Sequence, residues 1–216
     1  RNPGDGRNHA LETLACVGNP AKIISGPMKG AVGYVTGTHG GVEHTMVWLP
    51  KDVLEGMEGS ETFLIRARGQ GLKLLDHPDV FVMNLDPGLL EKLPVRETPE
   101  GLSFPVAAVI PAYMMGAGIG EQTLMEGDYD IMTQDREEVK RLGLDRLRFG
   151  DLVAIQDHEA SYGPHYRKGA VTIGVIVHSD SFTSGHGPGV TALATAATGL
   201  TYHLDPEANL KTWLCQ

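Results

Sequence analysis

The stretch Ile23-Ile24-Ser25-Gly26-Pro27-Met28-Lys29-Gly30-Ala31-Val32-Gly33-Tyr34-Val35 decides how the first third of the chain folds. It holds short apolar runs joined by a Gly-Pro turn, and further runs rich in β-branched and apolar residues follow it. Glycines separate these runs, as expected for strands joined by tight turns. The predicted strands are residues 22–25, 31–36, 45–49 and 61–67. Short strands at this spacing predict a small β-barrel.

The same stretch resembles the KOW motif of small SH3-like barrels, which occur in ribosomal and transcription-elongation proteins. Gly26-Pro27 suits a tight turn, Gly30 suits a bulge, and Gly33 suits a close approach of a neighbouring backbone. Only Lys22 and Lys29 are basic across the motif, and no pair of aromatic residues accompanies them to stack on bases. We therefore expect the barrel to be a scaffold and not an RNA-binding surface.

The rest of the chain predicts further strands and a few short helices. Helices are expected after Asn8 as an N-cap, after Asp86-Pro87, and over residues 135–142. Strand character returns at residues 152–155 and 171–178. The predicted fold is mainly β, with a small SH3-like barrel and a second β-rich unit that carries a few short helices. The expected organisation is residues 1–93 as the barrel unit with short flanking helices, 94–105 as a linker, and 106–216 as a β-rich C-terminal unit carrying the candidate site.

Composition and charge limit the partners of this chain. It has 216 residues, is 41% hydrophobic and carries a formal net charge of −9. Residues 1–75 contain 8 Lys and Arg against 7 Asp and Glu, whereas residues 76–216 contain 10 against 20. This balance argues against nucleic acid as a partner, because such binding depends on cationic contacts to phosphates. The longest apolar run, residues 106–115, contains Pro111 and is too short to cross a bilayer, so we expect no membrane association.

The cysteines and the first residues predict the setting of the protein. Cys16 and Cys215 favour reduced thiols in a cytoplasm over a disulfide framework. The chain starts at Arg1 without a methionine and continues at once with the turn-like residues 2–6. We therefore expect a cytoplasmic protein with an upstream segment that has been removed, forms a separate chain, or is absent from this sequence.

The richest candidate site lies in residues 157–189, which hold four of the nine histidines of the chain among acidic residues and glycines. His178, Asp180 and His186 supply two imidazoles and a carboxylate, a ligand set that suits a divalent iron, manganese or zinc ion. His178 and Asp180 share a face if the segment is extended. We predict these three as the catalytic residues, with His178 or His186 as acid or base and Asp180 orienting it or sharing a metal with it.

The same region also suits an anion. Ser179, together with the hydroxyls and glycines after it, offers hydrogen-bond donors to a phosphate or carboxylate, and Arg167 and Lys168 could neutralise the charge. Asp157 and His165 complete the predicted ligand-binding set, and we expect one of them to lie close to the three catalytic residues. The structural alternative is a solvated turn whose side chains bond to one another's backbone. Acyl transfer by a nucleophilic serine is disfavoured, because no Gly-x-Ser-x-Gly pattern occurs.

Two other patterns are weaker candidates. His39 and His44 flank Gly40-Gly41, and a hairpin there would place the two histidines across from each other as a third contributor to a site, or simply as a polar turn. The glycines of residues 116–120 lie one residue too close for a dinucleotide-binding turn, and the acidic residues after them would repel a phosphate. We therefore predict a structural glycine turn there, followed by a long acidic connection.

The chain as a whole resembles the prokaryotic domain-of-unknown-function family 4438. The resemblance implies a mainly β architecture of small barrel-like units, a cytoplasmic setting, and a family without an assigned activity or catalytic set. Members usually carry an additional N-terminal segment. The resemblance rests on residues 18–19, 24–26, 37–44 (GTHGGVEH), 69–75 (GQGLKLL), 83–87 (MNLDP), 150–153 (GDLV), 166–174 (YRKGAVTIG) and 185–190 (GHGPGV).

Two functional hypotheses follow. In the first, the chain is an enzyme acting on a small polar or anionic metabolite, with a divalent metal as its potential cofactor. In the second, it is a non-catalytic small-molecule-binding or assembly protein, and a homo-oligomer is expected. The second hypothesis rests on a surface of mainly small residues that could pack tightly against another subunit, although packing in the core explains them as well. These residues are Leu193, Ala194, Ala196 and Ala197.

Overall fold

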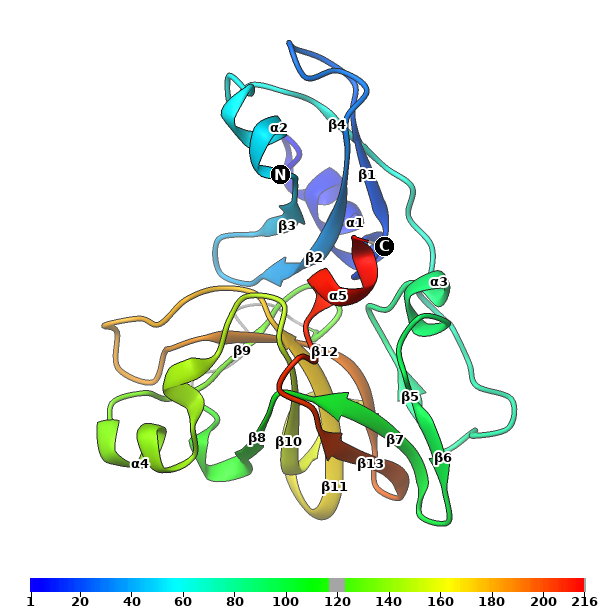
Figure 1. Ribbon diagram of the computed structural model, residues 1–216, viewed down its shortest axis with the longest axis vertical. Helices are drawn as coiled ribbons and strands as arrows, with labels where there is room; N and C mark the ends of the chain where they lie inside the picture. Colours follow the sequence, from blue (N-terminus) through cyan, green and yellow to red (C-terminus); the bar gives the residue numbers. More distant parts are fainter. Residues whose placement is uncertain (117–122, 216) are drawn as a thin grey trace.

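The computed structural model describes residues 1–116 and 123–215. The N-terminal third forms an antiparallel sheet in the order β3-β2-β1-β4, built from β1 (Pro20–Ile23), β2 (Val32–His39), β3 (His44–Trp48) and β4 (Phe63–Ile65). Two helices accompany it, α1 (Asp5–Leu14) and α2 (Lys51–Glu55), as Figure 1 shows. The predicted strands are confirmed, but the SH3-like barrel is not. Because β3 and β4 are the two edges, the strands form a curled sheet that amounts to half a barrel.

Glycines allow the tight curvature of this sheet. Gly30 has a φ of 103°, a value that L-residues with a side chain rarely adopt, but it lies in the turn between β1 and β2, and no bulge interrupts the register of these strands. A Cβ at Gly33 would lie 2.1 Å from the carbonyl oxygen of Trp48, which confirms the predicted close approach of a neighbouring backbone. The sheet curls around Ile23, Leu49 and Val53, which are buried together.

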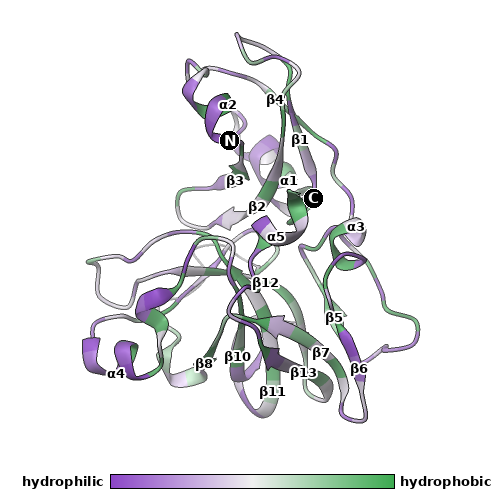
Figure 2. Cartoon of the chain, in the orientation of Figure 1, coloured by the Kyte–Doolittle hydropathy of each residue, from purple (hydrophilic) through white to green (hydrophobic). Residues whose placement is uncertain are grey.

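The second sheet is the centre of the molecule. It runs in the order β5-β12-β11-β10-β8, and β9 also pairs with β12. Its strands are β5 (Phe81–Val82), β8 (Ala108–Pro111), β9 (Tyr129–Asp130), β10 (Leu152–Glu159), β11 (His165–Ile176) and β12 (Gly189–Ala196). All described pairs are antiparallel except β8 with β10. Figure 2 shows apolar residues along much of this sheet, and residues 152–155 of β10 and 170–176 of β11 are all buried, whereas the first five residues of β11 are exposed.

Burial in this sheet corrects one interpretation of the small residues of β12. Leu193, Ala194 and Ala196 are each at most 2% exposed and pack in the main core with Ile173 and Phe104. They are therefore core residues and not a surface available to another subunit.

A small third sheet lies beside the central one in the order β13-β7-β6, formed by β6 (Arg96–Thr98), β7 (Gly101–Val106) and β13 (Gly199–Leu204). Residues 94–105, expected to be a linker, thus contain β6 and most of β7. Phe104 of β7 is fully buried, so the segment is part of the core. Strand β5 lies before residue 93 but pairs with β12, so the N-terminal part of the chain contributes a strand to the central sheet.

Side-chain caps explain two of the remaining helices. As predicted, Asp86 caps α3 (Pro87–Leu90) by accepting hydrogen bonds from the amides of Gly88 and Leu89. The helix predicted over residues 135–142 is α4 (Arg136–Arg141), with Asp135 as its N-cap. The predicted cap at Asn8 is wrong. Helix α1 already begins at Asp5, and the Asn8 amide group, which is buried, donates instead to the carbonyl oxygen of Glu43.

The last regular elements are the 3-10 turns Ala112–Met114 and Leu144–Arg146 and the C-terminal helix α5 (Leu210–Leu214). None of the helices in the described residues has both the length and the apolar character needed to cross a membrane.

Candidate metal site

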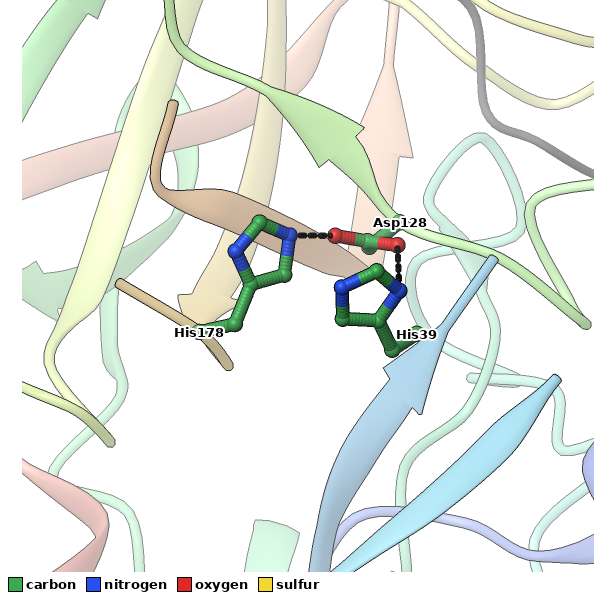
Figure 3. Close-up of side chains that lie close together, drawn as sticks. All are labelled: His39, Asp128 and His178. Atoms are coloured by element: carbon green, nitrogen blue, oxygen red, sulfur yellow. Dashed lines mark ion pairs between the residues drawn. The ribbon is translucent and has the colours of Figure 1, made fainter. Parts of the chain in front are cut away.

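Three distant segments meet at the His178 end of the central sheet. His39 ends β2, Asp128 directly precedes β9, and His178 follows β11 by two residues. The pairing of β9 with β12 brings Asp128 to this end, and the Thr191 hydroxyl of β12 accepts a hydrogen bond from the Thr38 amide of β2. Figure 3 shows the two imidazole rings next to each other, each facing one oxygen of the Asp128 carboxylate.

The Asp128 carboxylate is the centre of this cluster. Its Oδ2 lies 2.6 Å from Nε2 of His178, and its Oδ1 lies 4.0 Å from Nδ1 of His39. The amide of Gly40 donates to the same Oδ1 over 2.8 Å. One ligand atom from each of the three side chains can be chosen so that all lie within 4.8 Å of one another. The ligands of a tetrahedral ion with bonds of about 2.0 Å lie about 3.3 Å apart, so the three side chains would have to adjust to hold one ion.

A second carboxylate reaches the same histidine. Asp128 and Asp130 alternate along an extended segment and therefore share a face. Oδ1 of Asp130 lies 3.3 Å from Nε2 of His178, while its Oδ2 lies 2.7 Å from Nδ1 of His186. The side chains of both aspartates are almost inaccessible, at 4% and 11% exposure. Asp130 thus links the predicted residues His178 and His186.

The tautomers of the two central histidines are fixed by backbone carbonyls. Nδ1 of His39 lies 2.6 Å from the carbonyl oxygen of Gly40, and Nδ1 of His178 lies 2.9 Å from that of Ser179. In each ring Nδ1 therefore carries the proton and donates it, which leaves Nε2 for another partner. The rings stack with their centroids 4.2 Å apart. Metal-binding histidines are commonly oriented by such a bond from the other ring nitrogen.

The electrostatics of the cluster favour a positive charge. Burial alone would lower the pKa of His178, but its hydrogen bonds to Asp128 and Asp130 outweigh burial and raise this pKa to about 10. Burial would raise the pKa of Asp130, but the bonds from His178 and His186 outweigh it and lower that pKa. At neutral pH the two carboxylates are therefore matched by a proton on Nε2 of His178, at the position where a cation could replace it.

Gly189, the first residue of β12, makes room for the Asp128–His178 pair. A Cβ at this position would lie 1.8 Å from Oδ2 of Asp128 and 2.3 Å from Nε2 of His178. No side chain fits there, so the glycine is required by the close approach of the pair.

Cavities border His178 and Ser179 on two sides. One, of about 370 Å³, lies between β3, the residues before β10, and α5. The other, of about 430 Å³, lies beside α4 and is lined by Arg136, Lys140 and Asp180 among others. A small molecule could therefore reach the cluster from either side.

Asp180 lines the second cavity together with His178, but its carboxylate binds other partners. Oδ1 accepts from the Thr133 hydroxyl and the Ser181 amide, and Oδ2 accepts from Nη1 of Arg136 over 2.6 Å. The loop that carries His186 is thereby tied to residues 133–136. Asp180 thus anchors this loop, and Asp130 is the carboxylate that contacts both histidines.

The other predicted ligand-binding residues lie elsewhere, so the expectation that Asp157 or His165 would join His178 is wrong. Strand β10 pairs with β11 from Leu152 opposite Val175 to Glu159 opposite His165, and these seven steps at about 3.3 Å each put the two ends of β11 roughly 23 Å apart. His165, Arg167 and Lys168 belong to its first four residues, and Asp157 accepts from the amide of Gly169 near that end. They cannot neutralise an anion bound near His178. A separate ligand-binding role for them stays a prediction.

Sequence reasoning missed Asp128 and Asp130, which it placed in a long acidic connection. The signal was the alternation Asp-Tyr-Asp, which suits a strand with two carboxylates on one face. The two-residue strand β9 is too short to be predicted from periodicity. His39 and His44 do pair across the hairpin at Gly40-Gly41, as predicted, but only His39 enters the cluster. Of the predicted glycine turn, residues 117–120 lie outside the described residues.

Comparison with known proteins assigns the chain to a family defined by sequence and not by activity. The N-terminal domain of the DUF4438 family matches residues 1–91, and the C-terminal domain of the same family matches residues 92–214. The chain therefore belongs to the DUF4438 family, whose domains are described as being of unknown function.

One solved structure, the crystal structure of TM1086, is similar throughout. It is 46% identical, with a TM-score of 0.90 over 97% of this chain and 74% of that one. No curated protein matches the chain.

Proposed function

We propose that this chain is a metal-dependent enzyme acting on a small polar or anionic metabolite, with a divalent cation held by His39, Asp128 and His178. The observation that carries the proposal is the convergence of these three side chains, from segments far apart in the sequence, with ligand atoms within 4.8 Å. Two imidazoles and one carboxylate suit zinc, iron or manganese and leave coordination positions open for water or substrate.

The proton on His178 supports this proposal. Ligands of a tetrahedral ion lie about 3.3 Å apart when the bonds are about 2.0 Å. The 2.6 Å separation between Nε2 of His178 and Oδ2 of Asp128 is that of a shared proton. Replacing the proton by a cation therefore requires these two atoms to move apart by about 0.7 Å.

His186 is the acid or base in this proposal. Its Nδ1 donates to Asp130, which fixes the tautomer and leaves Nε2 as the proton acceptor. Its side chain is 43% exposed, so a bound molecule can reach it. The bound cation would polarise a substrate oxygen or lower the pKa of a bound water, and His186 would move the proton. Asp130 therefore takes the orienting role that the sequence analysis gave to Asp180.

Metal titration tests the proposal. Chelator-treated protein is titrated with Zn²⁺ and Mn²⁺ by calorimetry, and bound metal is counted by elemental analysis after desalting. Asp128→Asn and His39→Ala should each weaken binding by about 100-fold or more, because each removes a ligand. The matched control is His44→Ala, since His44 is the partner of His39 across the hairpin but is exposed and lies outside the cluster. Absence of stoichiometric binding, or equal binding by Asp128→Asn and wild type, would overturn the proposal.

A further inference from the structure

The cavity on the α5 side of His178 has a distinct chemical character. Its walls come from four parts of the chain: the end of the N-terminal sheet with α2, the residues before β10, residues 176–179, and α5. Most of its lining side chains are apolar, and the largest of them are Trp48, Leu49, Leu54, Phe149, Leu210 and Leu214. Apolar walls on this scale are typical of sites that enclose the hydrocarbon part of a ligand.

Few polar groups in this cavity are free to bind a ligand. The Asn209 side chain already bonds to Asp151, to the carbonyl oxygen of Phe149 and to the amide of Lys211. The Lys211 ammonium forms no ion pair with any residue that the structure describes. The other polar positions are Thr36, and His178 and Ser179 on the side of the candidate metal site. Apart from Thr36 and Lys211, the polar groups that a ligand can meet therefore lie on the side of His178, and the rest of the lining is mainly apolar.

This arrangement limits what the body of a substrate can be. A hydroxyl group buried against these walls without a partner costs about 1–3 kcal/mol, whereas each buried methylene group is favourable. A sugar or a polyol would leave several hydroxyls unpaired. An alkyl chain or an aromatic ring would leave none.

We infer that the substrate of the proposed metal site has an oxygen-bearing head that reaches the cation and a compact apolar body, aliphatic or aromatic, that fills this cavity. The part of this inference that concerns the head rests on the proposed function. The part that concerns the apolar body rests on the cavity alone. It narrows the substrate from a small polar or anionic metabolite to one that joins an oxygen-bearing head to a short hydrocarbon portion.

Hydroxamates with alkyl chains of increasing length test this inference. The hydroxamate group binds metal ions, and the gain in affinity with a longer alkyl chain measures how well the cavity accepts an apolar body. Acetohydroxamate carries the head alone, and hexanohydroxamate adds four methylene groups. Since one buried methylene contributes about fourfold in affinity, hexanohydroxamate should bind Zn²⁺-loaded protein at least about 30-fold more tightly. A hydroxamate of equal length with a polyhydroxylated chain should bind no better than acetohydroxamate.

Leu54 provides the variant that isolates the cavity. It is 53% exposed, so Leu54→Glu should leave the fold intact while placing a charge in the wall. The variant should bind acetohydroxamate as wild type does and lose most of the gain from the longer chain. Leu14→Glu is the matched control, since Leu14 is 54% exposed and lines a different cavity.

The outcomes separate this inference from the metal proposal. If acetohydroxamate binds in a metal-dependent way but hexanohydroxamate binds no better, the metal site stands and the apolar body is overturned. If no metal binds, the metal proposal fails. The apolar body is then tested by titrating 1-hexanol into the metal-free protein and following the NMR signals of the Leu210 and Leu214 methyl groups. Shifts of these signals that Leu54→Glu abolishes support the apolar body, and unchanged signals overturn it.

Discussion

The two ends of β11 carry similar residues and have opposite properties. In the sequence around one end, His158 and His165 are neighbours of Asp157 and Glu159. In the sequence after the other end, His178 and His186 are neighbours of Asp180. His178 receives two buried carboxylates from residues 128–130, and these raise its pKa to about 10. No carboxylate forms a hydrogen bond with His158 among the described residues, so burial, together with the nearby His165, outweighs the charge of Glu159 and lowers the pKa of His158 to about 4, and its Nε2 has no hydrogen-bond partner there. The difference teaches that a high density of histidines in sequence does not make a metal site.

Strand β9 separates the two environments. Asp128 and Asp130 face His178, whereas the ring of Tyr129, on the opposite face of the strand, lies 5.2 Å from the ring of His158. His158 donates from Nδ1 to the Thr172 hydroxyl, because that hydroxyl gives its own hydrogen to the carbonyl oxygen of His158. One end of the sheet therefore holds a charged, polar cluster and the other a neutral, buried imidazole.

The largest effect is expected from Gly189→Ala. The added methyl group would overlap Asp128 and His178, so the pair must separate or β12 must shift. We expect a loss of about 3 kcal/mol in the free energy of unfolding and the loss of metal binding. Chemical denaturation and metal titration measure the two effects. Gly6→Ala is the control, since no atom lies within 4 Å of a Cβ there, and a Gly189→Ala protein as stable as wild type would contradict the structure of the pair.

The charged end should lose stability at alkaline pH. In metal-free protein the folded pKa of His178, about 10, lies above its unfolded value near 6.5. Its stabilising contribution is therefore complete below pH 6.5 and is lost as the pH rises towards 10, by at most roughly 1.4 kcal/mol per unit of pKa difference. Urea denaturation between pH 6 and 10 measures this slope. His178→Gln should remove it, and saturating Zn²⁺ should flatten it, because the metal replaces the proton. An identical slope in His178→Gln would show that other groups cause it.

The neutral end should lose stability in acid. The folded pKa of His158, about 4, lies below its unfolded value, so the unfolded chain binds the proton more readily. Stability is then unaffected above pH 6.5 and falls as the pH decreases towards 4, by up to about 3 kcal/mol. Denaturation of wild type and His158→Asn between pH 7 and 4 tests this. The difference in the free energy of unfolding between the two proteins should become smaller as the pH falls from 7 to 4. A constant difference would mean that His158 titrates normally.

The smallest effect is expected from His165→Ala. His165 is an exposed side chain with a 3.4 Å ion pair to Glu159, and such pairs contribute little. We expect a change in stability below about 0.5 kcal/mol and unchanged metal affinity. If this variant weakened metal binding as much as Asp128→Asn does, the contrast between the two ends of β11 would be wrong.

Much of the secondary structure followed from local signals. The strands around Gly30 and Gly33 and the caps Asp86 and Asp135 were predictable, because turns and caps depend on residues only a few positions apart. Closure of the N-terminal sheet was not, because it depends on whether β3 and β4 meet, and no local pattern encodes that contact.

For the site, the sequence by itself determined that residues 157–189 are rich in histidine, that His39 and His44 face each other across a hairpin, and that the chain belongs to a mainly β family. Which histidine contacts which carboxylate depends on how the strands pair in three dimensions. The pairing of β9 with β12 places Asp128 and Asp130, about 50 residues away in the chain, against His178, and the end of β2 adds His39. The physical reason is that a carboxylate changes the pKa of a histidine or shares a metal with it only within a few ångströms, and this distance depends on strand pairing and not on separation along the chain.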